Sequence, residues 1–455
     1  MNTLKAGFAR VNVTPMMGVA IMGYYKPRQV KGVLDDLYIN ALALEAGGKQ
    51  VLLMCIDHCG VKQHIMRPIR EHISEVTGVP VEAIFISATH THTGPALRED
   101  LIHDDKADNT LAEEYYQFVY RKMADVAQMA LQDLKPARMG WGIGQAPNIA
   151  FVRRFRMKDG SVKTNPGVDN PDIVAPIGDV DERVSVLRFD REGAETLVLV
   201  NFADHPDVVG GELVSADWPG FLRNTVEKTL DNTKCIFFNG AQGDVNHVNV
   251  HPRGGYLNDM FMDFDDVARG YKHAQYMGRV VTAGVLQAFD KVQYVDVDSV
   301  NFIQRTIKVP ANLPKAEDLP QAYYIKQMHE QGRDAELPYS GMMLTTAVAE
   351  ALRMVRLENG PEAFEMPLTG VAIGNISMIG IPGEPFTGIG RGLKLAEGWD
   401  LVIPCCLTNG SEGYFPMQDA YDEGGYEARS SSFKAGVAEL IIREGIALLS
   451  DLKKG

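Results

Sequence analysis

The sequence predicts an α/β protein in which layered mixed β-sheets are flanked by helices. Short apolar runs rich in β-branched residues recur and stop abruptly in small or polar residues, as in residues 51–57 (VLLMCID) and 83–87 (AIFIS). Apolar runs of about four to eight residues bounded by Gly or Pro are typical of buried strands. Amphipathic stretches lie between these runs, and the alternation of strand and helix predicts a layered α/β domain.

The other expected elements follow along the chain. Further strands are expected at residues 197–202 (LVLVNF), 235–239 (CIFFN), 376–381 (ISMIGI) and 401–406 (LVIPCC). Helices are expected at residues 65–77, 111–134 and 269–289. Residues 148–181 carry NPG, DNP and APIG turn signals and are expected to be irregular. Because no Pro-, Gly- or Ser-rich linker divides the chain, we expect one catalytic domain over residues 1–455, with a helical insertion at about 315–358.

The composition excludes several classes of function. The 455 residues include 45 Lys+Arg and 59 Asp+Glu, a net charge of −14, which disfavours binding to nucleic acid or to an anionic membrane. We see no apolar run of about 18 residues that could span a bilayer. The five cysteines lack zinc-finger spacing and fit reduced thiols, so the expected location is the cytoplasm. The expected partner is a small-molecule or saccharide substrate, and self-association into a homo-oligomer stays open.

Side chains suited to metal or acid/base chemistry follow several of the expected strands. His90 and His92 follow residues 83–87, and His205 follows residues 197–202. Glu384 and Tyr414 follow the two later strands. Ligands and catalytic groups gather at the carboxyl ends of strands in α/β sheets, so folding could assemble these side chains into one site.

Each of these residues also has a purely structural interpretation. His90 and His92 lie on one side of an extended segment, where both could bind a metal, or one could bind while the other moves a proton. Equally, both could only hydrogen-bond nearby carbonyls. His205, Glu384 and Tyr414 taken singly are typical of turns or packed positions. Arg153 and Arg154 form either a solvated basic spot or a guanidinium pair that holds a carboxylate.

The motifs resemble those of the neutral/alkaline non-lysosomal ceramidase family, in its N-terminal catalytic domain. The resemblance begins at residues 6–15 (AGFARVNVTP) and is strongest at residues 87–95 (SATHTHTGP), close to the family's Ser-x-Thr-His-Thr-His-Ser-Gly-Pro. It continues through His205, the PGE turn at Glu384, and Gly413-Tyr414 with Tyr426-Glu427, and so covers nearly the whole chain. It implies a ceramidase-like fold and a zinc-dependent hydrolase of an amide bond.

The resemblance also implies roles for particular residues. The Zn²⁺ ligands would be His90, His205, Glu384 and Tyr414, with His92 beside the metal as the proton carrier. Tyr426 and an arginine, taken as Arg154, would stabilise the oxyanion. Asn246 stands where the family has a serine with an assigned catalytic role. An amide side chain cannot be a nucleophile, so a serine-dependent route is closed at Asn246, whereas a metal-dependent route stays open.

Two further expectations concern the substrate. The family's C-terminal β-sandwich domain and a signal peptide are expected to be absent, which predicts hydrolysis of an amide-type bond in a small or polar substrate rather than in ceramide. One alternative is a metal-dependent lyase acting on a uronate-containing saccharide, with Arg153 and Arg154 neutralising the carboxylate. The other is a non-catalytic binding protein with the same fold.

Overall fold

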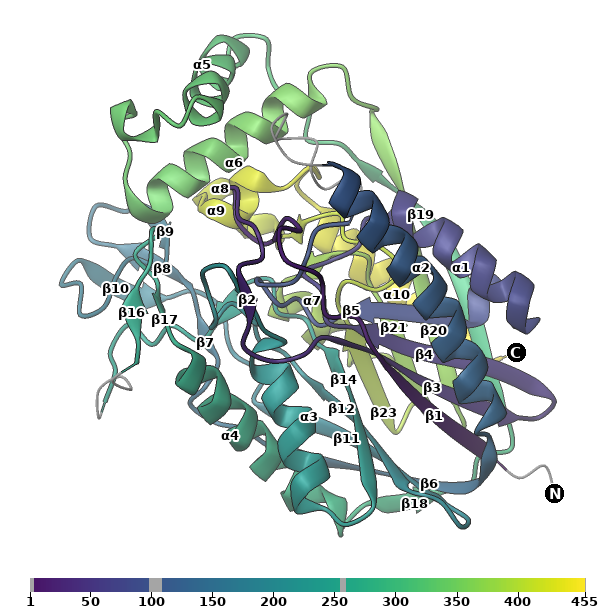
Figure 1. Cartoon of the computed structure of the whole chain (residues 1–455). Coiled ribbons are helices and arrows are strands. Elements are labelled where there is room, and N and C mark those ends of the chain that lie inside the picture. The colour runs from purple at the N-terminus through teal and green to yellow at the C-terminus, as the bar shows by residue number, and fades with distance from the viewer. Residues whose placement is uncertain (1–3, 98–108, 254–258, 455) are drawn as a thin grey trace.

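Two large mixed sheets form the centre of the molecule (Figure 1), in a computed structural model that describes residues 4–97, 109–253 and 259–454. Within these residues, the larger sheet has nine strands, of which β18 (Gln293–Val295) pairs with β6 outside the main path. The main path runs in the order β14 (Thr233–Asn239), β12 (Thr196–Phe202), β11 (Arg183–Arg191), β6 (Lys135–Gln145), β1 (Lys5–Asn12), β3 (Tyr38–Ala46), β4 (Lys49–Ile56) and β5 (Ile84–Ala88). The smaller sheet runs β19 (Val300–Pro310), β20 (Ala363–Ile373), β21 (Ile376–Gly380) and β23 (Leu401–Cys405).

Helices cover the outer faces of both sheets (Figure 1). They are α1 (Gln63–Thr77), α2 (Asn109–Gln132), α3 (Asp217–Thr229), α4 (Tyr271–Phe289) and α10 (Val437–Leu452). α2 packs on β1 and β3, α4 packs on β6 and α3, and α10 packs on β19 and β20. All six expected strands and the three expected helices are present within a few residues. The strands were recognisable because most of their positions are buried, which produces near-continuous apolar runs.

The two edges of the larger sheet meet, although β14 and β5 stand at opposite ends of the strand order. The chain that follows β23 bridges them. The Cys406 amide donates to the Asn239 carbonyl at 3.0 Å, and the Asn409 amide donates to the Ile86 carbonyl at 2.8 Å. Between them, the hydroxyls of Ser87 and Thr408 lie 2.7 Å apart. The carboxyl ends of β5, β12, β14 and β23 are thereby brought to one place.

The region expected to be irregular contains short strands. β8 (Arg154–Met157) lies between β9 (Val162–Thr164) and β10 (Ile173–Pro176) in a small sheet, and β7 (Phe151–Val152) pairs with β15 (Val245–Asn246). The NPG and DNP signals lie between β9 and β10, which each pair with β8. β8 and β9 form a hairpin, and in its turn the Asp159 carboxylate accepts a hydrogen bond from the Ser161 amide at 2.9 Å.

The segment at about 315–358 contains α5 (Leu319–Glu330), η2 (Asp334–Glu336) and α6 (Gly341–Leu357). Its helices share an apolar cluster that includes Ile325, Met328, Val348 and Leu352. α6 packs on α9 (Tyr426–Ser430), and on α5 the His329 ring lies 2.7 Å from the Tyr25 carbonyl through Nε2. The helical segment therefore lies against the loop that carries Tyr25 and against α9, which begins at Tyr426.

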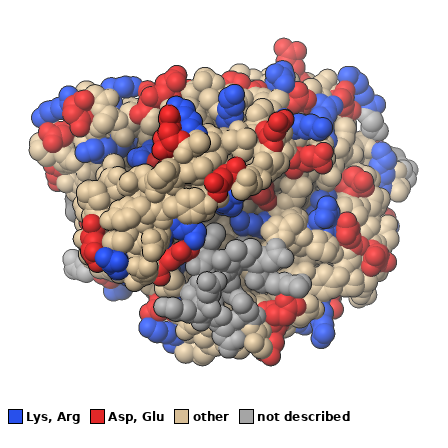
Figure 2. Space-filling view, turned by 90° about the horizontal axis from the view of Figure 1, so that it is seen from above, with Lys and Arg blue, Asp and Glu red and all other residues tan. Residues whose placement is uncertain are grey.

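Short elements complete the description. They are β2 (Gly32–Val33), η1 (Val81–Ala83), β13 (Leu213–Val214), β16 (Phe261–Met262), β17 (Ala268–Arg269), β22 (Glu384–Pro385), α7 (Thr387–Leu393), β24 (Tyr414–Phe415) and α8 (Gln418–Glu423). No helix within the described ranges is both long and apolar enough to cross a bilayer. On the face shown in Figure 2, basic and acidic side chains of the described residues are interspersed.

A buried ion pair between β4 and α3 gives the first prediction. Arg223 donates to both carboxylate oxygens of Asp57, at 2.8 and 2.5 Å, and both side chains are buried. Asp57→Ala leaves the Arg223 charge buried without its partner, so we expect the free energy of unfolding to fall by about 3–5 kcal/mol. Chemical denaturation followed by circular dichroism measures this loss.

The double variant Asp57→Ala/Arg223→Met is the matched control and should regain part of the loss, because no unpaired charge remains buried. Glu212→Ala, which removes the exposed ion pair with Lys31, should change stability by less than about 1 kcal/mol. Wild-type stability in Asp57→Ala would contradict this account.

Candidate metal centre

Two histidines and one glutamate meet at the joined strand ends. His90 follows β5, His205 follows β12, and Glu384 opens β22. The Nε2 atoms of His90 and His205 each lie 3.2 Å from Oε2 of Glu384. All three residues are buried, with relative exposures of 4%, 1% and 8%. We call His90, His205 and Glu384 the histidine–glutamate cluster.

Hydrogen bonds on the far side of each imidazole fix which nitrogen faces the cluster. Nδ1 of His90 contacts the Cys59 carbonyl, and Nδ1 of His205 lies 2.9 Å from the carbonyls of both Gln242 and Val245. Because a carbonyl can only accept, each neutral imidazole carries its proton on Nδ1 and presents an Nε2 lone pair to Glu384. This is the form in which a histidine binds a metal.

The cluster fits a divalent metal ion. Oε2 of Glu384 is buried and has no hydrogen-bond partner within the part of the chain that the structure describes. Ligand atoms placed about 2.0–2.1 Å from a tetrahedral zinc ion lie about 3.3 Å from one another. The observed 3.2 Å separations match that spacing. Two histidine nitrogens and one carboxylate oxygen are also a common donor set for catalytic zinc.

The electrostatics of the cluster demand a positive charge. Burial disfavours a charged imidazole, but the Glu384 carboxylate outweighs it and holds the pKa of His90 well above its ordinary value. Burial also opposes ionisation of Glu384, yet His90 and His205 hold its pKa well below the usual range. Burial and then Arg153 lower the pKa of His205 to about 4, so that this ring stays neutral at pH 7. The Glu384 carboxylate therefore favours a positive charge in the space that the three side chains share.

The backbone of His90 is strained where it enters the cluster. Its φ of 79° lies in the left-handed region, which is uncommon for a residue with a side chain. The strained segment is held by the His90 amide, which donates to the His58 carbonyl at 2.9 Å, and by the Thr89 amide, which donates to the Ile56 carbonyl at 2.9 Å. Backbone strain of this kind concentrates at functional sites.

Tyr414 and Arg153 approach His205 from the other side. β22 and β24 pair in parallel with Glu384 opposite Tyr414, and the Tyr414 hydroxyl lies 3.5 Å from Nε2 of His205. Arg153 places Nη1 3.4 Å from the same nitrogen. Its Nε donates to the buried Glu427 carboxylate at 2.7 Å, and its Nη2 donates to the Gly243 carbonyl at 2.7 Å. Burial and the Glu384 charge hold the pKa of Tyr414 well above its ordinary value.

His92 and Tyr426 border the same space. Nε2 of His92 lies 3.3 Å from Nε2 of His90, and the two rings stand nearly perpendicular with centroids 4.7 Å apart. The Tyr426 ring stands edge-on to Tyr414 with centroids 5.5 Å apart. The structure therefore brings together the four expected metal ligands, the expected proton carrier and the expected second tyrosine.

Arg154 and Asn246 are not part of this group. Arg154 donates to Glu423 and to the Gly424 carbonyl, each at 3.2 Å. Successive residues of an extended chain point to opposite sides, so only Arg153 faces the centre, in the place expected for Arg154. The Asn246 amide donates to Asn165 at 3.0 Å, and its Oδ1 accepts from the Val248 amide at 3.0 Å. These bonds tie the Asn246 side chain to its neighbouring loop.

Sequence reasoning missed three residues that contact the expected site. Glu427 pairs with Arg153, Asp207 faces His92, and the Cys59 carbonyl accepts from His90. Glu427 directly follows Tyr426, and Asp207 lies two residues after His205, on the same side of an extended segment. The two-residue spacing from His205 could therefore have predicted that Asp207 lies at the site.

The fold and the site together define an α/β protein that carries a candidate metal centre at converging strand ends. A family model described as "Neutral/alkaline non-lysosomal ceramidase, N-terminal" matches residues 4–262, more than half of the chain. The chain belongs to this family, whose characterised activity as ceramidase makes it a family of hydrolases. The expected family is thus confirmed.

Solved structures support the fold. The crystal structure of neutral ceramidase from Pseudomonas aeruginosa matches with a TM-score of 0.75 at 16% identity, covering 100% of this chain and 75% of that one. A ceramidase complexed with C2 matches with a TM-score of 0.72 at 16% identity, covering 100% of this chain and 76% of that one. The predicted fold class of layered mixed sheets flanked by helices is confirmed.

The histidine–glutamate cluster predicts stoichiometric metal binding. Glu384→Gln keeps the shape of the side chain but removes the charge that attracts a cation, so we expect metal content after dialysis to fall from about one ion per chain to a small fraction. Inductively coupled plasma mass spectrometry measures the content, and circular dichroism checks folding. His251→Ala, at an exposed histidine, is the control and should retain the metal. Full metal content in folded Glu384→Gln would rule out the assignment.

Proposed function

We propose that this protein is a zinc-dependent hydrolase that cleaves the amide bond of a small or polar N-acyl compound. The convergence of two Nε2 lone pairs and a carboxylate oxygen within 3.2 Å, with both Nδ1 atoms held by carbonyls, is the main support. Membership of the ceramidase family supports the hydrolase class. The donor set favours zinc among the common divalent metals.

In this proposal His90, His205 and Glu384 hold the metal. The Tyr414 hydroxyl, which lies 3.5 Å from Nε2 of His205, completes the ligand set. When bound, the ion would polarise the substrate carbonyl and make a water molecule easier to deprotonate. Because Glu384 is the only carboxylate among these four residues, it sets the charge preference of the site. The histidines set its geometry through their fixed tautomers.

His92 is the proposed proton carrier. Its Nε2 points toward the histidine–glutamate cluster, 3.3 Å from Nε2 of His90, so it can take a proton from a reacting water and return it to the leaving nitrogen. A positioned acid/base group of this kind contributes about 10²–10⁴-fold to a rate.

Arg153 and Tyr426 are the proposed stabilisers of the oxyanion. Arg153 brings a guanidinium N–H next to His205, and Tyr426 places its ring against Tyr414. A preorganised donor aimed at developing negative charge contributes about 10²–10³-fold. Because the Asn246 side chain is tied to Asn165, we assign it no step.

The polar surroundings support the substrate class. Tyr24 and Tyr426 are partly exposed, and their rings lie against His92 and Tyr414 respectively. Such side chains suit a substrate with hydrogen-bonding groups near the scissile bond. The uronate lyase required both Arg153 and Arg154 for the substrate carboxylate, but Arg154 pairs with Glu423 away from the cluster, which weighs against it.

The activity itself is tested with metal-loaded protein and a panel of N-acyl amino acids, N-acyl amines and short- and long-chain ceramides, scored by released fatty acid. We expect hydrolysis of a polar N-acyl compound, loss of activity on chelation, and recovery with Zn²⁺. His92→Gln should lower kcat by about 10²–10⁴-fold with its metal content retained. Ceramide as the preferred substrate would overturn the substrate class. Absence of any released acid from metal-loaded protein would overturn the hydrolase.

Neighbouring arginines provide a matched test of the oxyanion role. Arg153→Lys keeps a positive charge beside Glu427 but loses the fork geometry, so we expect kcat to fall by about 10²-fold or more. Arg154→Lys should leave kcat close to wild type, because Arg154 pairs with Glu423 away from the cluster. Steady-state kinetics of the two variants measure the difference. Equal losses, or a loss confined to Arg154→Lys, would contradict the assignment.

A further inference from the structure

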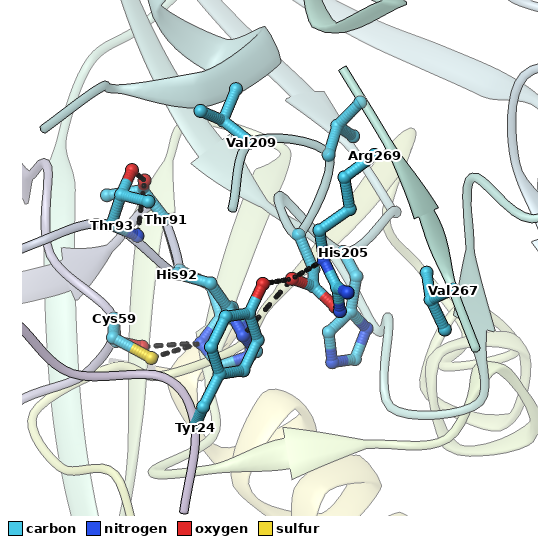
Figure 3. A network of polar contacts seen from close by, with 12 residues as sticks. Tyr24, Cys59, Thr91, His92, Thr93, His205, Val209, Val267 and Arg269 are labelled. Atoms are coloured by element: carbon cyan, nitrogen blue, oxygen red, sulfur yellow. Dashed lines mark hydrogen bonds and ion pairs between the residues drawn. The ribbon is translucent and has the colours of Figure 1, made fainter. Parts of the chain in front are cut away.

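The side chains of Tyr24, His92 and Arg269 lie close together (Figure 3). Asp207 faces Nδ1 of His92, whereas His90 lies against Nε2 of the same ring. Nδ1 of His92 is buried and has no hydrogen-bond partner among residues that the structure describes. Oδ1 of Asp207 lies 3.5 Å from this nitrogen. That separation exceeds the usual N–H···O distance, so the contact is electrostatic; hydrogen bonds between catalytic groups are often this long before substrate binds.

Asp207 is itself held in place from two directions. Arg269 donates through Nε to Oδ1 at 3.0 Å and through Nη2 to Oδ2 at 2.7 Å, in a bidentate arrangement. The Tyr24 hydroxyl donates to Oδ1 as well. The two Arg269 nitrogens and the Tyr24 hydroxyl fix the orientation of the Asp207 carboxylate and compensate its charge. A carboxylate held in this way can position a neighbouring side chain, but it is poorly suited to bind a substrate.

The backbone and ring of His92 are also confined. Arg28 donates to the His92 carbonyl at 2.7 Å, and its guanidinium lies 4.0 Å from the centroid of the Tyr24 ring. The Tyr24 ring in turn lies 5.4 Å from the His92 ring. The ring of His92 therefore has one polar neighbour on each side, Asp207 at Nδ1 and His90 at Nε2.

We infer that Asp207 is a positioning residue that makes Nδ1 the protonated nitrogen of neutral His92 and leaves the Nε2 lone pair facing the histidine–glutamate cluster. A carboxylate beside one imidazole nitrogen selects the tautomer with the proton on that nitrogen. In the opposite tautomer, Nε2 would be a donor rather than a proton acceptor toward the histidine–glutamate cluster, and a lone pair would face the Asp207 charge. The catalytic consequence rests on the proposed function, whereas the tautomer is a property of the chain alone.

Asp265 offers a matched control. It accepts from Nη1 and Nη2 of the same Arg269, through Oδ1 at 2.7 Å and Oδ2 at 2.9 Å, whereas Asp207 accepts from Nε and Nη2. Asp207→Asn and Asp265→Asn each remove one carboxylate from buried Arg269. If the loss of a carboxylate partner of Arg269 lowers the stability of the fold, it should do so in both variants. An effect on His92 should occur only in Asp207→Asn.

The first measurement is steady-state kinetics of the metal-loaded enzymes on whichever N-acyl compound the wild-type protein hydrolyses. We expect Asp207→Asn to lower kcat by about 10²-fold with KM and metal content unchanged, as misplacement of a catalytic group does. Asp265→Asn should retain kcat. Equal kcat in wild type and Asp207→Asn, or equal losses in the two variants, would overturn the positioning role.

The second measurement does not depend on activity. ¹⁵N-histidine-labelled, metal-free wild-type protein gives imidazole signals whose shifts distinguish Nδ1–H from Nε2–H, and the loss of one set in His92→Gln assigns His92. We expect Nδ1–H in wild type and in Asp265→Asn, and a shift toward Nε2–H in Asp207→Asn. A wild-type Nε2–H tautomer would overturn the inference. A confirmed Nδ1–H tautomer in a protein that hydrolyses no N-acyl compound would overturn the proposed function alone.

Discussion

Three electron-pair donors facing one another in a buried space repel unless a positive charge lies between them, and the centre of this protein is built around that condition. Nε2 of His90, Nε2 of His205 and Oε2 of Glu384 meet at 3.2 Å. An uncompensated buried carboxylate costs several kcal/mol, so the fold must hold these atoms together against their own preference. Carbonyl groups behind both imidazoles and a left-handed backbone at His90 hold them there.

The scaffold meets this condition by closing the larger sheet on itself. β5 and β12 carry His90 and His205, and they are far apart in the strand order. Residues 406–409 hydrogen-bond to the strand ends of both β14 and β5, which brings the two histidines to one place. The parallel pairing of β22 with β24 then sets Glu384 opposite Tyr414. The geometry of the centre thus depends on hydrogen bonds between segments more than 300 positions apart, such as that from the Asn409 amide to the Ile86 carbonyl.

The sequence predicted those features of the structure that depend on a single local pattern. Strands such as β5 are buried at every position, so their apolar runs identified them, and His90, His205 and Glu384 stood out because they follow such runs. The sequence could not show whether Arg153 or Arg154 faces the centre. Alternate residues of an extended segment point to opposite sides, and the side that faces inward is set by pairing with the distant Glu427. The small sheet around β8 was missed because its strands are too short for periodicity to register.

The arginines around the centre are paired with other carboxylates, so they do not neutralise Glu384. Arg153 places a guanidinium nitrogen 3.4 Å from Nε2 of His205, and on its own that charge would offset Glu384 and compete with a metal ion. Glu427 takes up the Arg153 charge at 2.7 Å, and Asp207 takes up that of Arg269 at 2.7 Å on the His92 side. Each arginine therefore orients hydrogen bonds at the centre without adding net charge to it. The carboxylate of Glu384 is left as the one uncompensated charge of the histidine–glutamate cluster, and its requirement for a cation persists because its neighbours are already neutralised.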